Sequence, residues 1–389
     1  MKSYAIMHLE RHVATIRGDG SCTIYYPQFM PYNLCLEEAE GNDLDVQMNN
    51  LTNFYYWCAT RLLTLDRKYA KEILNSLGFK QAVTDRERAE IAISYHALSL
   101  TDVFWIRKLR EEIRFQEINL YDHSLSDAFV DVSLRGRALT AENAGLISYG
   151  DSAGDLSTAG VAPKAWIRRE GGFLLLKDGD DREVEAELVA SRIARCFDVE
   201  QVLYEPWDYD GQRVSRSRLM TSKERSIVPA QYVEIYAANR GTTLQKTVVR
   251  HDEYSYHMMN IIDYLVGNTD RHWENWGFWV NNRNNRLEKL HPLMDFNRTF
   301  HSYDTMDGAK CLTTEKTMSQ KDAAIMGVQR IGLNQTADLP EDLPELFRDL
   351  NDLAGMRLDI QFIKRLELLR TTEENKAGVS PIRPGGRND

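Results

Sequence analysis

One stretch, residues 268–300, constrains the fold more than any other part of this 389-residue chain. It reads NTDRHWENWGFWVNNRNNRLEKLHPLMDFNRTF. Two aromatic and apolar runs, WGFWV and LEKLHPLM, flank the turn-rich NNRNN, a pattern that predicts a β-hairpin. If its pairing is centred near Asn285, then Asn275 and Asp295 lie opposite each other at the open end, and Asp270 lies just before it.

Asp270, Asn275 and Asp295 are the side-chain types that phosphoryl transfer requires. The transferred group needs positioning and charge neutralisation, so such sites supply a carboxylate for the acceptor hydroxyl, with an amide and a second carboxylate for magnesium. Taken singly, each residue is more commonly a turn cap or a strand end. Their combination in one stretch favours a site, with Asp270 orienting the acceptor and Asn275 and Asp295 binding Mg²⁺.

NTDRHWEN followed by a hairpin and DFN resembles the catalytic and metal-binding loops of HipA-like serine/threonine kinases, which also resemble phosphatidylinositol-kinase-type enzymes. The resemblance implies an α+β, bilobal protein-kinase-like catalytic domain with a mixed β/helical N-terminal domain, and ATP and Mg²⁺ as cofactors. His272 belongs to the same catalytic loop. We expect it to be structural, bonding loop carbonyls or Asp295, because Asp270 serves the hydroxyl. Asn297 stands where eukaryotic kinases carry the DFG glycine.

A second candidate site is the run STAGVAPKAWIRREGGFLLLKDG, which predicts a loop, a strand near 165–168, a Gly-Gly turn and a strand at 173–177. A loop with small residues, Gly160 and Lys164 before a strand can cradle phosphates. It does not match the P-loop pattern. The resemblance implies that this is the HipA-like phosphate loop and that Lys177 holds nucleotide phosphates. The alternative for Lys177 is a solvated strand end.

Ser157 lies three residues before Gly160. HipA-like kinases carry a serine in this loop whose autophosphorylation expels the loop and switches the enzyme off, and the resemblance assigns that role to Ser157. A phosphoserine adds about −1.5 to −2 charges, which would repel nucleotide phosphates. The alternatives are a plain loop residue that bonds its own backbone, or modification of Thr158 instead.

The run DREVEAELVASRIARCFDV predicts a helix in which Glu187 shares a face with Ala190, Ala194 and Phe197. An inward carboxylate needs a cation, and Lys177 is the candidate, giving the lysine–glutamate pair of kinase nucleotide sites. Glu183 and Glu185 are expected on the solvated face, although Glu185 replaces Glu187 if the helix is rotated.

We expect four regions along the chain. Residues 1–150 form an N-terminal β/α domain that opens with ATIRGDGSCTIYY, and a Gly/Ser/Asp-rich run marks its end. Residues 151–236 form a kinase N-lobe with the phosphate loop, and the hinge lies within 219–236. Residues 237–375 form a C-lobe that begins with the helical stripe EYSYHMMNIIDYLVGN. Residues 376–389 are a Pro/Gly-rich tail expected to be disordered.

Composition limits the remaining possibilities. A net charge of −10 opposes direct nucleic-acid binding. Five widely spaced cysteines without a CxxC pair indicate neither a disulfide framework nor a zinc site. No run of eighteen apolar residues occurs and the first residues carry charges, so we expect a cytoplasmic protein with no membrane contact.

The leading functional hypothesis is a Mg-ATP-dependent serine/threonine protein kinase acting on a protein substrate. The resemblance extends it to the toxin half of a toxin–antitoxin pair with a DNA-binding helix-turn-helix antitoxin. A lipid kinase is the enzymatic alternative, but the segment after Asp295 lacks a Lys/Arg run for an anionic headgroup. A non-catalytic pseudokinase is the third hypothesis, disfavoured because the required polar groups are all present.

Overall fold

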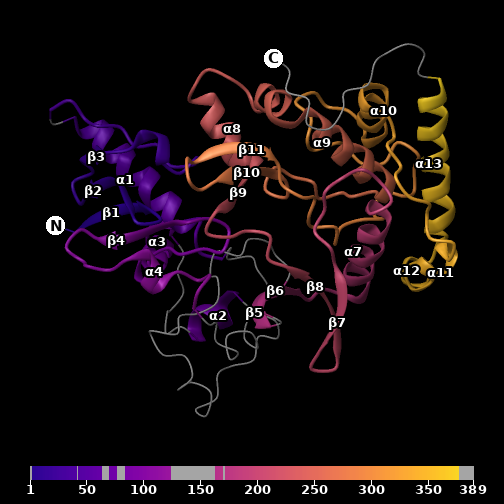
Figure 1. Cartoon of the computed structure of the whole chain (residues 1–389), viewed down its shortest axis with the longest axis horizontal. Coiled ribbons are helices and arrows are strands. Elements are labelled where there is room, and N and C mark those ends of the chain that lie inside the picture. The colour runs from indigo at the N-terminus through magenta and orange to yellow at the C-terminus, as the bar shows by residue number, and fades with distance from the viewer. Residues whose placement is uncertain are drawn as a thin grey trace. The chain divides into compact units, whose positions relative to one another are not determined.

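The computed structural model describes residues 2–41, 43–63, 70–76, 84–123, 163–169 and 171–375. The chain divides into two compact units, each built from several chain segments (Figure 1). Unit 1 contains Met1–Asp178, Arg218–Val228 and Val280–Arg286, and unit 2 contains Gly179–Ser217, Pro229–Trp279 and Leu287–Asp389. Helices alternate with antiparallel strand pairs, which confirms the predicted α+β class. The predicted boundary near residue 150 and the tail 376–389 lie outside the described residues.

Unit 1 begins with a four-stranded antiparallel sheet of order β3-β2-β1-β4. Its strands are β1 (Ser3–His8), β2 (Arg11–Arg17), β3 (Cys22–Ile24) and β4 (Phe104–Lys108). The residues Gly18, Asp19 and Gly20 lie between β2 and β3. Successive strand residues point to opposite faces. Thus Tyr4 and Ile6 join one apolar cluster whereas Ala5 and Met7 join another, so both faces of β1 are covered.

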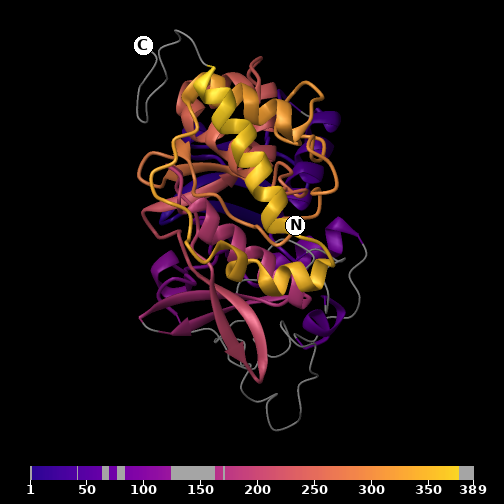
Figure 2. The ribbon, with the colours of Figure 1, turned by 90° about the vertical axis from the view of Figure 1, so that its right-hand side faces the viewer.

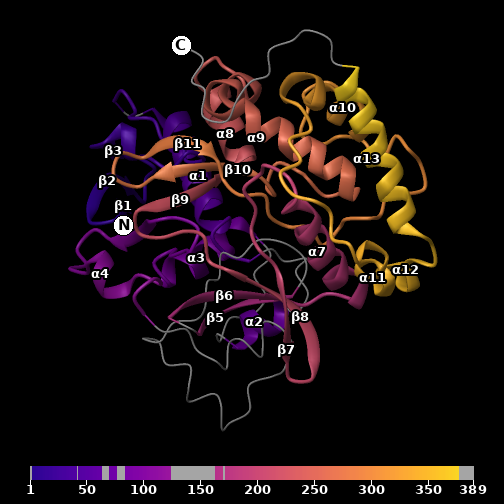
Figure 3. The ribbon, with the colours of Figure 1, turned by 45° about the vertical axis from the view of Figure 1, so that its right-hand side comes forward.

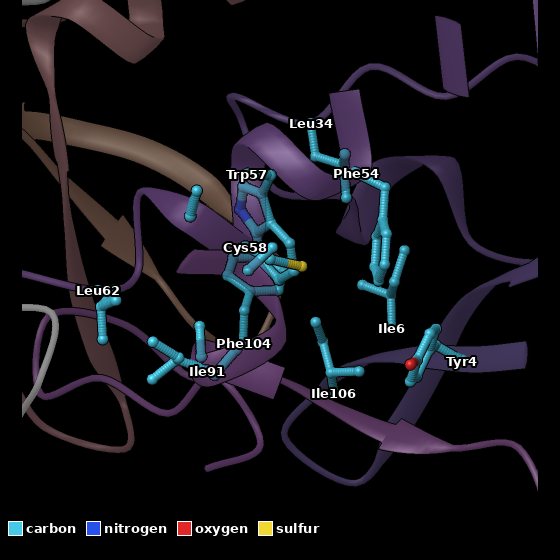
Figure 4. Packing of buried hydrophobic residues seen from close by; sticks show 14 of the residues in the cluster. Tyr4, Ile6, Leu34, Phe54, Trp57, Cys58, Leu62, Ile91, Phe104 and Ile106 are labelled. Carbon is cyan, nitrogen blue, oxygen red and sulfur yellow. The ribbon is translucent and has the colours of Figure 1, made fainter. Parts of the chain in front are cut away.

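Helix α1 (Leu44–Ala59) supplies the main cover for this sheet. It begins at Asp43, whose carboxylate accepts hydrogen bonds from the amides of Asp45 and Val46, as a good N-cap does. Its buried Phe54, Trp57 and Cys58 belong to the same cluster as the strand residues Tyr4 and Ile6 (Figure 4). Short elements η1 (Pro27–Phe29), α2 (Ala70–Ser76), α3 (Asp85–Ser94) and α4 (Phe115–Ile118) complete this part.

The predicted strands of the phosphate-loop region are β5 (Lys164–Arg169) and β6 (Gly172–Lys177), an antiparallel pair in unit 1. Gly171 has φ of 76° in the turn between them, a conformation that glycine adopts without steric cost. The register places Lys164 directly opposite Lys177 at the open end of this hairpin. The predicted strand–turn–strand is confirmed.

Unit 2 is mainly helical. Its long helices are α7 (Asp181–Ala194), α8 (Ala230–Ala238), α9 (Leu244–Val266), α10 (Gln320–Ile331) and α13 (Leu358–Glu374), joined by the short α11 (Leu343–Leu346) and α12 (Arg348–Ala354). Helix α13 packs against α9 and α10 (Figure 2). Helix α7 contacts α12 and α9 (Figure 3). The unit also contains the strand β7 (Glu205–Tyr209) and all but the last residue of its antiparallel partner β8 (Gln212–Arg218).

The hairpin predicted around NNRNN is confirmed as β10 (Gly277–Asn281) and β11 (Arg286–Leu290), in a three-stranded sheet of order β11-β10-β9 with β9 at Arg225–Pro229. Its turn residue Asn285 has φ of 55°, which Asn tolerates better than most residues. Among the described residues, no helix combines the length and apolar character needed to cross a membrane.

Candidate functional site

The candidate catalytic loop begins where α9 ends. Gly267 caps this helix in the left-handed conformation, with φ of 59°. A Cβ at this position would lie 2.6 Å from the Tyr303 ring, so a larger residue would displace that ring. The last turns of α9 are buried through Ile261, Ile262 and Leu265, so the loop starts from a rigid element. The helix predicted from EYSYHMMNIIDYLVGN is confirmed.

Within the loop, Asp270 and Asn275 are joined directly. The Asn275 Nδ2 donates to the Asp270 carbonyl oxygen at 2.8 Å and lies 3.4 Å from the Asp270 Oδ2. Since the amide nitrogen is used in this way, the side-chain oxygen is the atom that Asn275 can offer to a cation. Trp276 and Trp279, which follow the loop, are buried.

His272 contacts Asp270, and its predicted bonds to loop carbonyls or to Asp295 stay a prediction. Its Nε2 lies 3.8 Å from the Asp270 Oδ1, and its Nδ1 accepts a hydrogen bond from the Glu274 amide at 3.2 Å. The second contact fixes the ring within the loop. His272 therefore adds an ionisable neighbour to Asp270, which the sequence did not indicate.

Burial raises the pKa of Asp270 above its ordinary value. The charge of Asp295 raises this pKa further, whereas the neighbours His272, Arg298 and Arg271 lower it. Each of these two carboxylates makes ionisation of the other less favourable. A cation bound near both would stabilise their ionised forms.

Asp295 has an unusual backbone conformation, with φ of 60°. Its amide donates to the hydroxyl of the buried Tyr204 at 3.0 Å, and the Tyr204 ring lies edge-on to Phe296. Two residues earlier, Leu293 is bound through its amide and carbonyl to the backbone of residues 200–202. A left-handed non-glycine residue costs free energy and persists only where its surroundings hold it, a situation common at functional sites.

Asn275 and Asp295 suit magnesium bound together with a nucleotide. In the part of the chain that the structure describes, no group of three or more His, Cys, Asp or Glu side chains could hold a metal by itself. Mg²⁺ commonly takes one or two carboxylates and completes its shell with substrate phosphates and water. A carboxylate with an amide oxygen therefore fits the ion as a partner of ATP.

The candidate phosphate-binding lysines lie together in unit 1. Lys164 and Lys177 are cross-strand partners, and both are buried. Like charges directly opposite each other repel, and a nearby anion reduces this repulsion. Ser157 and Gly160 lie outside the described residues, and their predicted roles stay predictions.

Glu187 points inward from α7, as its spacing predicts, and is only 1% exposed. Its carboxylate accepts a hydrogen bond from the Ser215 hydroxyl within unit 2. Lys177 belongs to unit 1, so the predicted Lys177–Glu187 pair stays a prediction. The solvated face predicted for Glu183 and Glu185 is wrong: they are partly buried and pair with Arg298 at 3.0 Å and Arg213 at 2.9 Å, respectively.

No family model matches the chain, and no curated protein matches its sequence. A solved structure of the Shewanella oneidensis MR-1 toxin–antitoxin system, HipA with HipB and operator DNA, matches 97% of this chain and 100% of its own at 11% identity, with a TM-score of 0.55. The chain has the HipA fold. The Helicobacter pylori proinflammatory kinase CtkA matches 56% of this chain and 90% of its own at 12% identity, with a TM-score of 0.41.

The HipA-like fold confirms the resemblance drawn from NTDRHWEN and DFN. At this identity the likeness concerns the fold, so the roles of Asp270, Asn275 and Asp295 rest on the local geometry described above.

Arg271 is a residue of the candidate site that the sequence patterns did not indicate. It is 2% exposed and pairs with Asp263, which is itself buried in α9. One signal was available: Asp263 interrupts the apolar run IIDYLV, and a buried carboxylate needs a cation. The sequence does not say that the cation comes from the loop itself.

Proposed function

We propose that this chain is a Mg-ATP-dependent serine/threonine protein kinase of the HipA-like type. The main support is the geometry of the candidate site. Within one loop the Asn275 side chain donates a hydrogen bond to the Asp270 carbonyl, and Asp295 lies close enough to raise the pKa of Asp270. The HipA-like fold supports the proposal because a HipA toxin shares it over nearly the whole chain.

In this proposal Asp270 orients the acceptor hydroxyl and takes up its proton. A raised pKa makes the carboxylate a stronger base than an exposed aspartate. Asn275 and Asp295 hold the metal, which neutralises charge on the phosphate oxygens when it is bound. Lys164 and Lys177 bind nucleotide phosphates, and Glu187 orients Lys177.

We extend the proposal to a toxin that binds a DNA-binding helix-turn-helix antitoxin. The HipA of the matched structure is present together with HipB and operator DNA. The net charge of −10 supports contact with DNA through such a partner instead of through this chain.

Incubation with labelled ATP and a cell lysate tests the proposed activity. We expect label on proteins with the wild type and none with Asp270→Ala, whereas Asp352→Ala, on an exposed face of α12, should act as the wild type does. Label confined to the lipid fraction would identify a lipid kinase. Nucleotide binding without transfer to any acceptor would identify a pseudokinase.

A further inference from the structure

The Arg271 side chain connects three segments of unit 2. Its Nε lies 3.0 Å from the Asp263 Oδ2, and its Nη2 lies 3.1 Å from the Oδ1 of the same carboxylate in α9. Its Nη1 donates to the carbonyl oxygen of Asn275 at 2.8 Å and also to that of Met294. Asn275 ends the candidate catalytic loop and Met294 directly precedes Asp295. One guanidinium thus ties both halves of the candidate site to the same helix.

Asp263 supports the loop through a second residue as well. Its Oδ1 accepts a hydrogen bond from the Asn268 Nδ2 at 3.1 Å, and the Asn268 Oδ1 accepts one from the Asp270 amide at 3.0 Å. Asp270 is therefore flanked on both sides by residues that bind one carboxylate. These supports are buried: Asp263 is 4% exposed, Asn268 1% and Arg271 2%.

We propose that the Asp263–Arg271 pair is a positioning device that sets the separation of Asp270 and Asn275 from Asp295, and thereby the affinity for the metal–nucleotide complex. The inference deepens the proposed kinase function and rests on it. The hydrogen bonds of the Arg271 side chain go to one carboxylate and two carbonyl oxygens. Arg271 therefore acts on the reaction through the placement of Asp270, Asn275 and Asp295.

A lysine cannot replace Arg271 in this role. The planar guanidinium presents donors in a fixed fork, whereas an ammonium is a point charge that cannot reach the carboxylate and both carbonyls in the same geometry. Arg271→Lys therefore keeps the buried charge and loses the bridge. Replacing a residue that orients a metal ligand without touching the metal typically lowers metal affinity about 10–100-fold.

The test compares Arg271→Lys with Arg365→Lys. Arg365 is buried to a similar degree, at 1% exposed, and donates to the backbone carbonyls of Tyr264 and Thr305 at 2.7 and 2.9 Å and to that of Ser302. None of these acceptors belongs to 268–275 or 294–296. We expect Arg271→Lys to raise the half-saturating Mg²⁺ concentration for nucleotide binding about 10-fold or more. Arg365→Lys should lower the unfolding temperature and leave that Mg²⁺ requirement unchanged.

Hydrogen exchange provides a readout that does not depend on activity. Without ligand, Arg271→Lys should speed exchange of the backbone amides both in 268–275 and in 294–296, whereas Arg365→Lys should leave these two segments at the wild-type rate. Wild-type exchange at 294–296 in Arg271→Lys, or an equal change in both variants, overturns the inference. A wild type that binds Mg-ATP without transfer contradicts the proposed kinase activity instead, and the exchange comparison still decides on the positioning pair.

Discussion

At the scale of single residues, Asp270 and Asp295 are two carboxylates with different surroundings. Asp295 has its backbone held by Tyr204, whereas Asp270 is bonded through its carbonyl to Asn275. We expect Asp295→Ala to abolish metal-dependent nucleotide binding and Asp270→Ala to weaken it much less, since Asp295 holds the ion and Asp270 orients the acceptor. Calorimetry with Mg-ATP measures both affinities. Equal binding by the wild type and Asp295→Ala would refute the metal assignment.

The raised pKa of Asp270 also predicts a pH-dependent stability difference. A carboxyl group whose pKa is higher in the folded state destabilises that state once it ionises. Below about pH 4 the group is protonated in both states and has no effect. Asp270→Asn should therefore raise the unfolding temperature at about pH 7 in the absence of nucleotide, and this gain should vanish on acidification. Thermal unfolding across pH measures the difference; a gain that persists in acid would contradict it.

Among the helices, the end of α9 is expected to require glycine at position 267. Gly267 and Gly355 are both left-handed helix caps, with φ of 59° and 65°. A Cβ at Gly355 would meet nothing within 4 Å, whereas one at Gly267 would lie 2.6 Å from the Tyr303 ring. Gly355→Ala should cost about 1–2 kcal/mol from the backbone conformation alone. Gly267→Ala should cost more, because the added Cβ also displaces the Tyr303 ring, as denaturant unfolding of both variants can check.

We expect the two ends of the β5–β6 hairpin to differ in function. Lys164 and Lys177 pair at the open end, and Arg169 pairs with Gly172 at the turn. Lys177→Ala should weaken nucleotide binding strongly, because it removes one of two paired cations. Glu187→Ala should weaken it less, since the lysine partly keeps its place. Arg169→Ala is the control from the same hairpin, and an equal loss in all three variants would argue against a phosphate-binding role for Lys177.

For the whole molecule, we expect the proposed kinase activity to be regulated by autophosphorylation of Ser157. Incubation with Mg-ATP should phosphorylate this residue, and the added charge of about −1.5 to −2 should compete with ATP phosphates for Lys164 and Lys177. Phosphopeptide mapping identifies the site, with Ser157→Ala and Thr158→Ala as the paired controls. Nucleotide affinity should fall as modification rises. An active enzyme with unmodified Ser157 would show that the switch is absent.

Local sequence is enough to predict the elements that depend on neighbours along the chain. The end of α9 at Gly267, the β10–β11 hairpin, the β5–β6 turn and the inward direction of Glu187 all follow from local spacing and turn chemistry. The fold resemblance was also accessible, because the motif and its hairpin lie within one short stretch.

Which distant groups come into contact depends on how the elements pack in the folded chain. The Met294 carbonyl that Arg271 binds, the Tyr204 hydroxyl that holds Asp295 and the arginines that pair with Glu183 and Glu185 come from other elements of unit 2. Periodicity predicts the face of a helix on which a residue lies, but the partner on that face depends on how the elements pack. The surroundings that raise the pKa of Asp270 are set in the same way, because burial and the charge of Asp295 exist only after the chain has folded.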